Sequence, residues 1–140
     1  MSQENVEIVR GLQPSGVDLL SFLNALAPSE ARGGPFVDDF ESTFTSQHGS
    51  LPTRKGFEGF VAGWRDWLEA WERYEVWTED FIDAGDQIVV LARVNATTRR
   101  DRVELEHTPA AVWTLRNGLV RSVHMYYDRH MALKAVGLEE

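Results

Sequence analysis

The first candidates for a functional role are two polar residues, Arg93 and Asn95, within and directly after an apolar segment. Arg93 is the one charged residue within the run Ile88–Val94, and Asn95 lies two positions further on. Alternate residues of a strand share a face, so Arg93 and Asn95 would present adjacent hydrogen-bond donors. Parity alone leaves the direction of that face open, because both faces of this segment carry apolar residues.

Arg93 therefore has two interpretations. A guanidinium in an apolar cavity needs a carboxylate or a ligand oxygen as its partner. Arg93 either pairs structurally with an acidic side chain, or lies at the inner end of a cavity and binds a ligand. Without a ligand we expect its partner to be Asp39, Glu41 or Asp66.

The histidines offer one candidate general base. An unperturbed imidazole titrates at about pH 6.5, so His48 is a candidate for proton transfer at neutral pH. The alternative is an exposed loop histidine beside Gly49. His107 and His124 are interpreted as less informative, with His124 at a surface or a subunit interface. No histidine pair has the helical spacing of metal ligands, so we predict no metal site and no cofactor.

The composition argues against several classes of function. The 140 residues include 14 Lys+Arg and 22 Asp+Glu, a formal net charge of −8 that disfavours binding to nucleic acid and to anionic membranes. The absence of cysteine excludes thiolate nucleophiles and cysteine metal sites. No apolar run approaches the ~20 residues of a membrane span. We expect a single cytoplasmic domain over residues 1–140.

Hydrophobic periodicity predicts the elements that position these residues. A long helix is expected over about 54–73, where aromatic and aliphatic residues recur at intervals of three and four. Shorter helical patterns precede it at 6–12 and 19–26, and a weak edge-strand pattern covers 40–46. The helical stripe consists of Phe57, Phe60, Val61, Trp64, Trp67, Leu68 and Trp71.

After Arg73 the period changes toward two. Strands are expected at about 75–82, 87–98, 102–115 and 119–127, joined by short turns such as Asn117-Gly118. Asp128 and Gly137 suit the N-cap and the C′ position of a final helix. The order predicts an α+β fold in which a curved antiparallel sheet forms a cone around the long helix, with an internal cavity.

Several strings resemble the SnoaL-like branch of the nuclear transport factor 2-like superfamily. They are SQENVEIVR at 2–10, FIDAGD at 81–86, VWTLRNG at 112–118 and YYDR at 126–129. The resemblance covers nearly the whole chain. The superfamily includes ketosteroid isomerases, polyketide cyclases, limonene epoxide hydrolases, scytalone dehydratases and non-catalytic members, so fold alone does not select a chemistry.

The resemblance implies that Arg93 and Asn95 face inward. Epoxide hydrolases of this fold relay protons through two aspartates, and these positions hold Asn95 and Met125 here, which cannot do so. The protonated acid of ketosteroid isomerases falls near Ala111, and their base falls near Gln47 or His48. The predicted catalytic residues are His48 and Arg93. Strand parity and the resemblance together predict a ligand pocket lined by Trp64, Asn95, Ala111, Trp113, Met125 and Tyr127.

These features favour a protein that binds a small apolar molecule with an oxygen function. Isomerisation, cyclisation or dehydration by proton transfer would suit the fold. The alternative is a ligand-binding or interaction domain without catalysis. The outward sheet face, which carries Tyr126, predicts a homodimer.

Overall fold

The computed structural model describes residues 2–13, 15–19, 21–22, 35–46 and 49–138. Its helices are α1 (Ser2–Leu12), α4 (Gly56–Leu68) and α5 (Arg129–Ala135). The longer strands are β2 (Phe36–Ser46), β5 (Trp71–Ala84), β6 (Gln87–Thr98), β8 (Ala110–Arg116) and β9 (Leu119–Tyr126). The shorter strands are β1 (Val17–Asp18), β3 (Gly49–Ser50), β4 (Arg54–Lys55) and β7 (Glu104–His107). The expected second helical pattern, at 19–26, lies largely outside the described residues.

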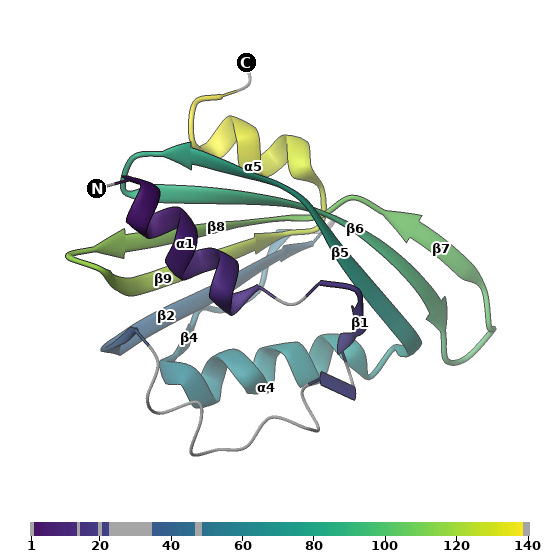
Figure 1. Ribbon diagram of the computed structural model, residues 1–140. Coiled ribbons are helices and arrows are strands. Elements are labelled where there is room, and N and C mark those ends of the chain that lie inside the picture. Colours follow the sequence, from purple (N-terminus) through teal and green to yellow (C-terminus); the bar gives the residue numbers. More distant parts are fainter. Residues whose placement is uncertain (1, 14, 20, 23–34, 47–48, 139–140) are drawn as a thin grey trace.

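The strands form one curved sheet in the order β1-β5-β6-β8-β9-β2-β3, with β4 paired to β2 and β7 paired to β6. Figure 1 shows that the sheet is curved and that α1 and α4 lie on its concave side. The α+β cone fold is confirmed. The sheet is mixed, however, because β2 and β9 run parallel. No hairpin links these two strands, so no short turn forces them to be antiparallel. The edge-strand expectation is wrong, since β2 pairs on both sides.

The long helix ends earlier than its apolar spacing predicted. Helix α4 stops at Leu68, and Trp71 opens β5 instead of adding a further helical turn. Arg99, at the end of β6, explains the change. Its backbone N–H donates to Ala70 O at 3.0 Å, and its guanidinium donates to the carbonyl oxygens of Glu69 and Trp71, both at 3.1 Å. These bonds satisfy carbonyl groups after the helix end and hold the chain against the sheet.

The third strand of the expected meander is interrupted at Pro109. Proline has no backbone N–H for a ladder, so β7 ends at His107 and β8 begins at Ala110. Both pieces pair with β6, which contacts β7 through residues 94–97 and β8 through residues 87–91. Strands β7 and β8 are therefore consecutive segments along the same side of β6.

Local turn and cap chemistry behaves as predicted. Asn117 and Gly118 have φ angles of +54° and +76°, as a type I′ hairpin requires. The Asp128 carboxylate accepts from the His130 backbone N–H at 2.9 Å and caps α5. Gly137 follows α5 with φ +78°, the left-handed conformation of a helix C′ residue.

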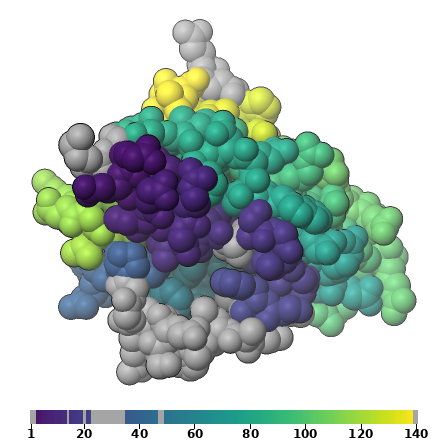
Figure 2. All heavy atoms as spheres, in the orientation of Figure 1, coloured from purple at the N-terminus to yellow at the C-terminus, as the bar shows by residue number. Residues whose placement is uncertain are grey.

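Both faces of β6 are buried at residues 88–90, each for a different reason. Its inner residues Ile88 and Val90 pack in the main core with Val9 of α1. Its outer residue Val89 packs with Ala132 of α5. This double coverage explains why β6 is apolar on both faces. In Figure 2 the purple atoms of α1 cover much of the inner side of the sheet.

Candidate functional site

An apolar cavity lies inside the cone, between the inner face of the sheet, α4 and the end of α1. Its volume is about 120 Å³. That size is close to the roughly 150 Å³ of an engineered apolar cavity that accepts benzene. Phe22 and Leu51 are the most exposed of its lining residues, and they mark its mouth. The other lining residues include Leu12, Gln13, Phe44, Phe60, Trp64, Trp67, Tyr74, Val76, Val90, Ala92, Val94, His107, Pro109, Ala111, Trp113, Met125 and Tyr127.

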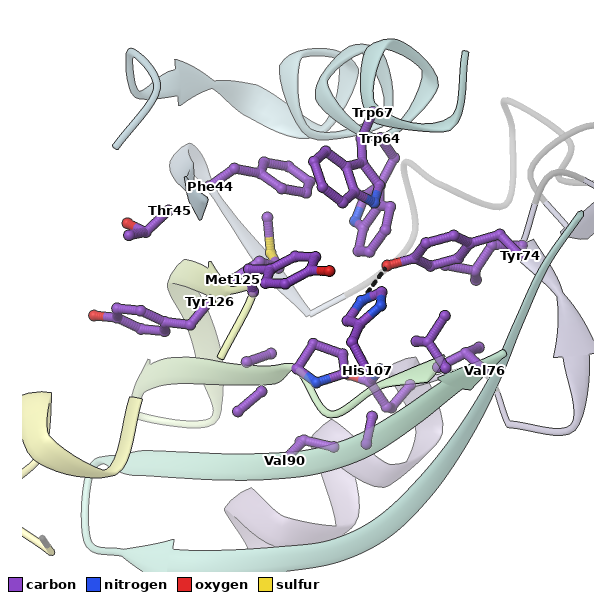
Figure 3. Close-up of a pocket in the computed structure, with 18 of the residues that line it drawn as sticks. Phe44, Thr45, Trp64, Trp67, Tyr74, Val76, Val90, His107, Met125 and Tyr126 are labelled. Atoms are coloured by element: carbon purple, nitrogen blue, oxygen red, sulfur yellow. Dashed lines mark hydrogen bonds between the residues drawn. The ribbon is translucent and has the colours of Figure 1, made fainter. Parts of the chain in front are cut away.

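The central polar feature of the cavity is a hydrogen bond between Tyr74 and His107. The Tyr74 hydroxyl lies 3.1 Å from His107 Nε2, drawn as a dashed line in Figure 3. Tyr74 is 3% exposed and His107 is 9% exposed. These two side chains therefore form a buried polar pair on a mostly apolar wall.

The register of three strands brings this pair together. On β6, Val94 lies opposite Val76 of β5 on one side and opposite His107 of β7 on the other. Tyr74 pairs with Ala96, two residues along β6 and on the same face as Val94. The short side chain of Ala96 leaves room for Tyr74 to reach across β6 toward His107.

Aromatic rings fix the orientation of the pair. Tyr127 stacks on the His107 imidazole, with centroids 4.4 Å apart and an interplanar angle of 15°. Trp71 meets the Tyr74 ring edge-on at 5.5 Å, and Trp67 meets the Tyr127 ring edge-on at 6.1 Å. Such offset and edge-to-face contacts add to the apolar burial of each ring.

Burial keeps both members of the pair uncharged at neutral pH. It raises the pKa of the Tyr74 hydroxyl, and a hydrogen bond from the Trp67 side chain only partly opposes that shift. It lowers the pKa of the His107 imidazole to about 4. Removing a charged form from water is costly in both cases, so the neutral phenol and the neutral imidazole prevail.

The second ring nitrogen of His107, Nδ1, indicates which tautomer of the imidazole is present and whether the Tyr74 hydroxyl can donate to a ligand. Its Nδ1 is buried without a hydrogen-bond partner among the described residues. If Nδ1 carries the hydrogen, a buried N–H donor stays unpaired. If Nε2 carries it, the imidazole donates to the Tyr74 oxygen, and the phenolic hydrogen is free for a ligand. Because unpaired buried N–H groups are the rarer case, the second tautomer fits this site better.

Arg93 and Asn95 do not lie in the cavity, so their predicted inward orientation is wrong. The Arg93 side chain is 49% exposed on the outer face, where its NH2 lies 3.0 Å from Glu79 Oε2 and its NH1 lies 4.0 Å from Glu106 Oε1. Its partners are therefore none of the three acidic residues that we expected. Val94 and Ala92 take the inward positions on β6. Because α5 covers part of the outer face of β6, that face also carries apolar residues. The alternation of residues along the strand therefore could not show which face is directed to the cavity.

The other predicted site residues divide into two groups. Trp64, Ala111, Trp113, Met125 and Tyr127 all line the cavity. His48 lies outside the described residues, so its role as a base stays a prediction. Among the residues that the structure describes, no three His, Asp or Glu side chains come together as a metal site would require.

Sequence reasoning missed Tyr74 and His107 as site residues. A signal existed for His107, because strand parity placed it on the same face as Ala111 and Trp113. Tyr74 had no such signal, since it fell between the expected end of the long helix and the expected start of the first meander strand.

The fold and the cavity define a class of α+β proteins in which a curved sheet encloses an apolar pocket. The SnoaL-like domain family matches residues 31–123, and the chain belongs to this family. No curated protein matches the chain. None of the described helices is long and apolar enough to cross a membrane.

Several solved structures share the fold. A protein assigned as a SnoaL-like polyketide cyclase from Jannaschia sp. is 21% identical, with 99% of this chain and 94% of that chain covered at a TM-score of 0.71. TerC co-crystallised with polyporic acid is 17% identical, with 73% and 80% covered at a TM-score of 0.55. A Catenulispora acidiphila protein with a ketosteroid isomerase-like fold, in complex with trimethylamine, is 23% identical, with 74% and 78% covered at a TM-score of 0.51.

Proposed function

We propose that this protein binds a small apolar molecule through one oxygen function, with the Tyr74 hydroxyl as the hydrogen-bond donor. The observation that carries the proposal is the buried Tyr74–His107 pair on the wall of an apolar cavity. Ligand sites combine apolar walls with a few placed polar groups, which orient the bound molecule. Tyr74 supplies the donor, and His107 holds its oxygen in place.

The similar proteins supply a second line of support. Two structures that share the fold contain a small organic molecule, polyporic acid in one and trimethylamine in the other. At these identities the likeness concerns the fold, so it supports a ligand-binding cavity of this kind and does not select the ligand.

Proton transfer on the bound molecule is the second candidate function. The neutral Tyr74–His107 pair favours it, because the phenol can give its proton to an oxygen of the bound molecule while the imidazole N–H stabilises the phenolate that is left, which takes the proton back when the reaction ends. No carboxylate lines the cavity among the described residues, so the aspartate-based routes of related enzymes lack their groups. Isomerisation, cyclisation or dehydration would then depend on Tyr74 and His107.

A thermal-shift comparison of toluene and benzaldehyde tests the binding proposal. The two probes share a one-ring skeleton, and only benzaldehyde accepts a hydrogen bond. A ligand at a hundredfold excess over its Kd stabilises the native state by about 2.7 kcal/mol, a shift of several degrees in Tm. We expect benzaldehyde to raise Tm more than toluene. No shift with either probe would contradict the proposal.

Arg93→Met provides a control variant for the same experiment. Arg93 lies outside the cavity, so its removal should leave the benzaldehyde shift unchanged. If this variant loses the benzaldehyde shift, the ligand binds near Arg93 on the outer face, and the assignment of Tyr74 as the donor is wrong.

A further inference from the structure

The cavity wall carries no formal charge among the described residues. Among these described residues, no Asp, Glu, Lys or Arg lines the cavity, and the one imidazole, that of His107, is held neutral by burial. Two ion pairs of the same strands lie on the outer face, where Arg93 meets Glu79 and Arg73 meets Glu75. Strands β5 and β6 therefore separate a charged outer surface from an uncharged interior.

This separation has an energetic consequence for a charged ligand. An ion that leaves water for an apolar site loses its hydration, and only a counter-ion or several strong hydrogen bonds offset that loss. An anion in the cavity would meet the Tyr74 hydroxyl but no guanidinium or ammonium. A cation would meet the aromatic rings of Trp67 and Tyr127 but no carboxylate among the described lining residues. Ring faces alone attract a cation weakly compared with its lost hydration.

We infer that the cavity selects the uncharged form of a planar, one-ring ligand and rejects carboxylates and ammonium ions of the same size. The inference rests on the proposed function and names the ligand class for the same site. The size follows from the cavity volume of about 120 Å³. The planar shape follows from the ring walls of Trp64, Trp67 and Tyr127, drawn in part in Figure 3.

A matched series of three probes tests the inference. Benzyl alcohol, benzoate and benzylamine share one ring and one substituent carbon, and at neutral pH they are neutral, anionic and cationic. Titration calorimetry on the full chain should give an affinity for benzyl alcohol at least about tenfold above those of the two ions, equivalent to about 1.4 kcal/mol. Affinities of benzoate or benzylammonium equal to or above that of benzyl alcohol would overturn the inference.

The outcomes separate the inference from the proposed function. Equal binding of all three probes would leave a ligand-binding cavity and overturn only its charge selection. If none of the three probes binds, and neither toluene nor benzaldehyde binds, both the charge selection and the proposed ligand-binding function are wrong.

A pair of variants at Gln13 tests the cause of the selection. Gln13 lines the cavity and its Oε1 accepts from the Trp113 indole N–H at 3.2 Å. Gln13→Lys adds an ammonium to the uncharged wall, and Gln13→Met adds a neutral side chain of similar length. Provided that both variants keep a cooperative melting transition, the Lys variant should gain benzoate affinity by about tenfold, whereas the Met variant should not. Equal benzoate affinity in the two variants would contradict the charge argument.

Discussion

Removing the Tyr74 hydroxyl isolates the group to which we assign ligand binding. Tyr74→Phe keeps the buried ring and its edge contact with Trp71, but it deletes the partner of His107 Nε2. A net hydrogen bond is worth about 0.5–1.5 kcal/mol, and a buried group left unpaired raises the cost to about 1–3 kcal/mol. His107 Nδ1 already has no partner among the described residues, so the imidazole would then lack both bonds. We expect destabilisation of about 1–3 kcal/mol, and a decrease in Tm of roughly 3–10 °C.

The same variant should change ligand preference in a specific direction. Benzaldehyde loses its donor, so its affinity should fall about five- to tenfold, the equivalent of one hydrogen bond. Toluene makes only apolar contacts, and its affinity should stay within about twofold. Measuring both affinities by calorimetry on the folded variant separates the binding effect from the stability effect.

Tyr126→Phe is the matched control for this experiment. It makes the same chemical change at a ring that stacks on His124 and also lines the cavity, but Figure 3 shows its hydroxyl directed away from Tyr74 and His107. The ratio of benzaldehyde to toluene affinity should therefore be unchanged in this control. An unchanged ratio in Tyr74→Phe, or an equal loss for both probes, would refute the assignment of the Tyr74 hydroxyl as the donor.

Four further predictions concern the stability and the oligomeric state of the protein. Folding stability should decrease as pH falls from about 6.5 to about 4, because the unfolded chain protonates His107 over this range while the folded protein resists it. Urea unfolding against pH should show a smaller decrease for His107→Gln; the burial-lowered pKa of His124 acts in the same direction and remains in both proteins. Trp67→Ala should destabilise by about 3 kcal/mol through lost core packing, and an unchanged Tm would show that this ring faces solvent. Arg93→Met should cost less than about 1 kcal/mol in chemical denaturation, as expected for a largely exposed ion pair, and a larger loss would contradict that description. Light scattering at micromolar concentration should give the mass of a homodimer; a monomer mass would count against the predicted pairing of sheets.

Local sequence chemistry determined much of the fold. The predicted strand at 87–98 coincides with β6, and the turn at Asn117-Gly118 and the caps of α5 formed as expected. These features depend on residues close together in the chain, so turn preference and period-two alternation specify them directly. The same alternation correctly grouped Ala111 with Trp113 on the inner face.

Tertiary contacts decided where the predicted elements end. The apolar spacing of the long helix continues to Trp71, but Arg99, 28 residues after Trp71, binds the carbonyl groups that follow Leu68. Pairing with β6 then makes Trp71 the first residue of a strand. Periodicity describes which residues can be buried together, and it does not include the competition between a further helical turn and a neighbouring strand.

In the candidate site, too, some features follow from local sequence and others depend on tertiary contacts. His107 shares its strand parity with Ala111 and Trp113, but we did not predict it as a site residue, and nothing local pairs it with Tyr74, which lies 33 residues earlier. Their contact depends on β6 separating β5 from β7, and on the break at Pro109 that ends β7 at His107. The sequence by itself determined which residues share a strand face. Only the tertiary structure decided that Arg93 lies on the outer face. Helices α4 and α5 cover opposite sides of the sheet, so both faces of β6 carry apolar residues and the sequence pattern does not distinguish them.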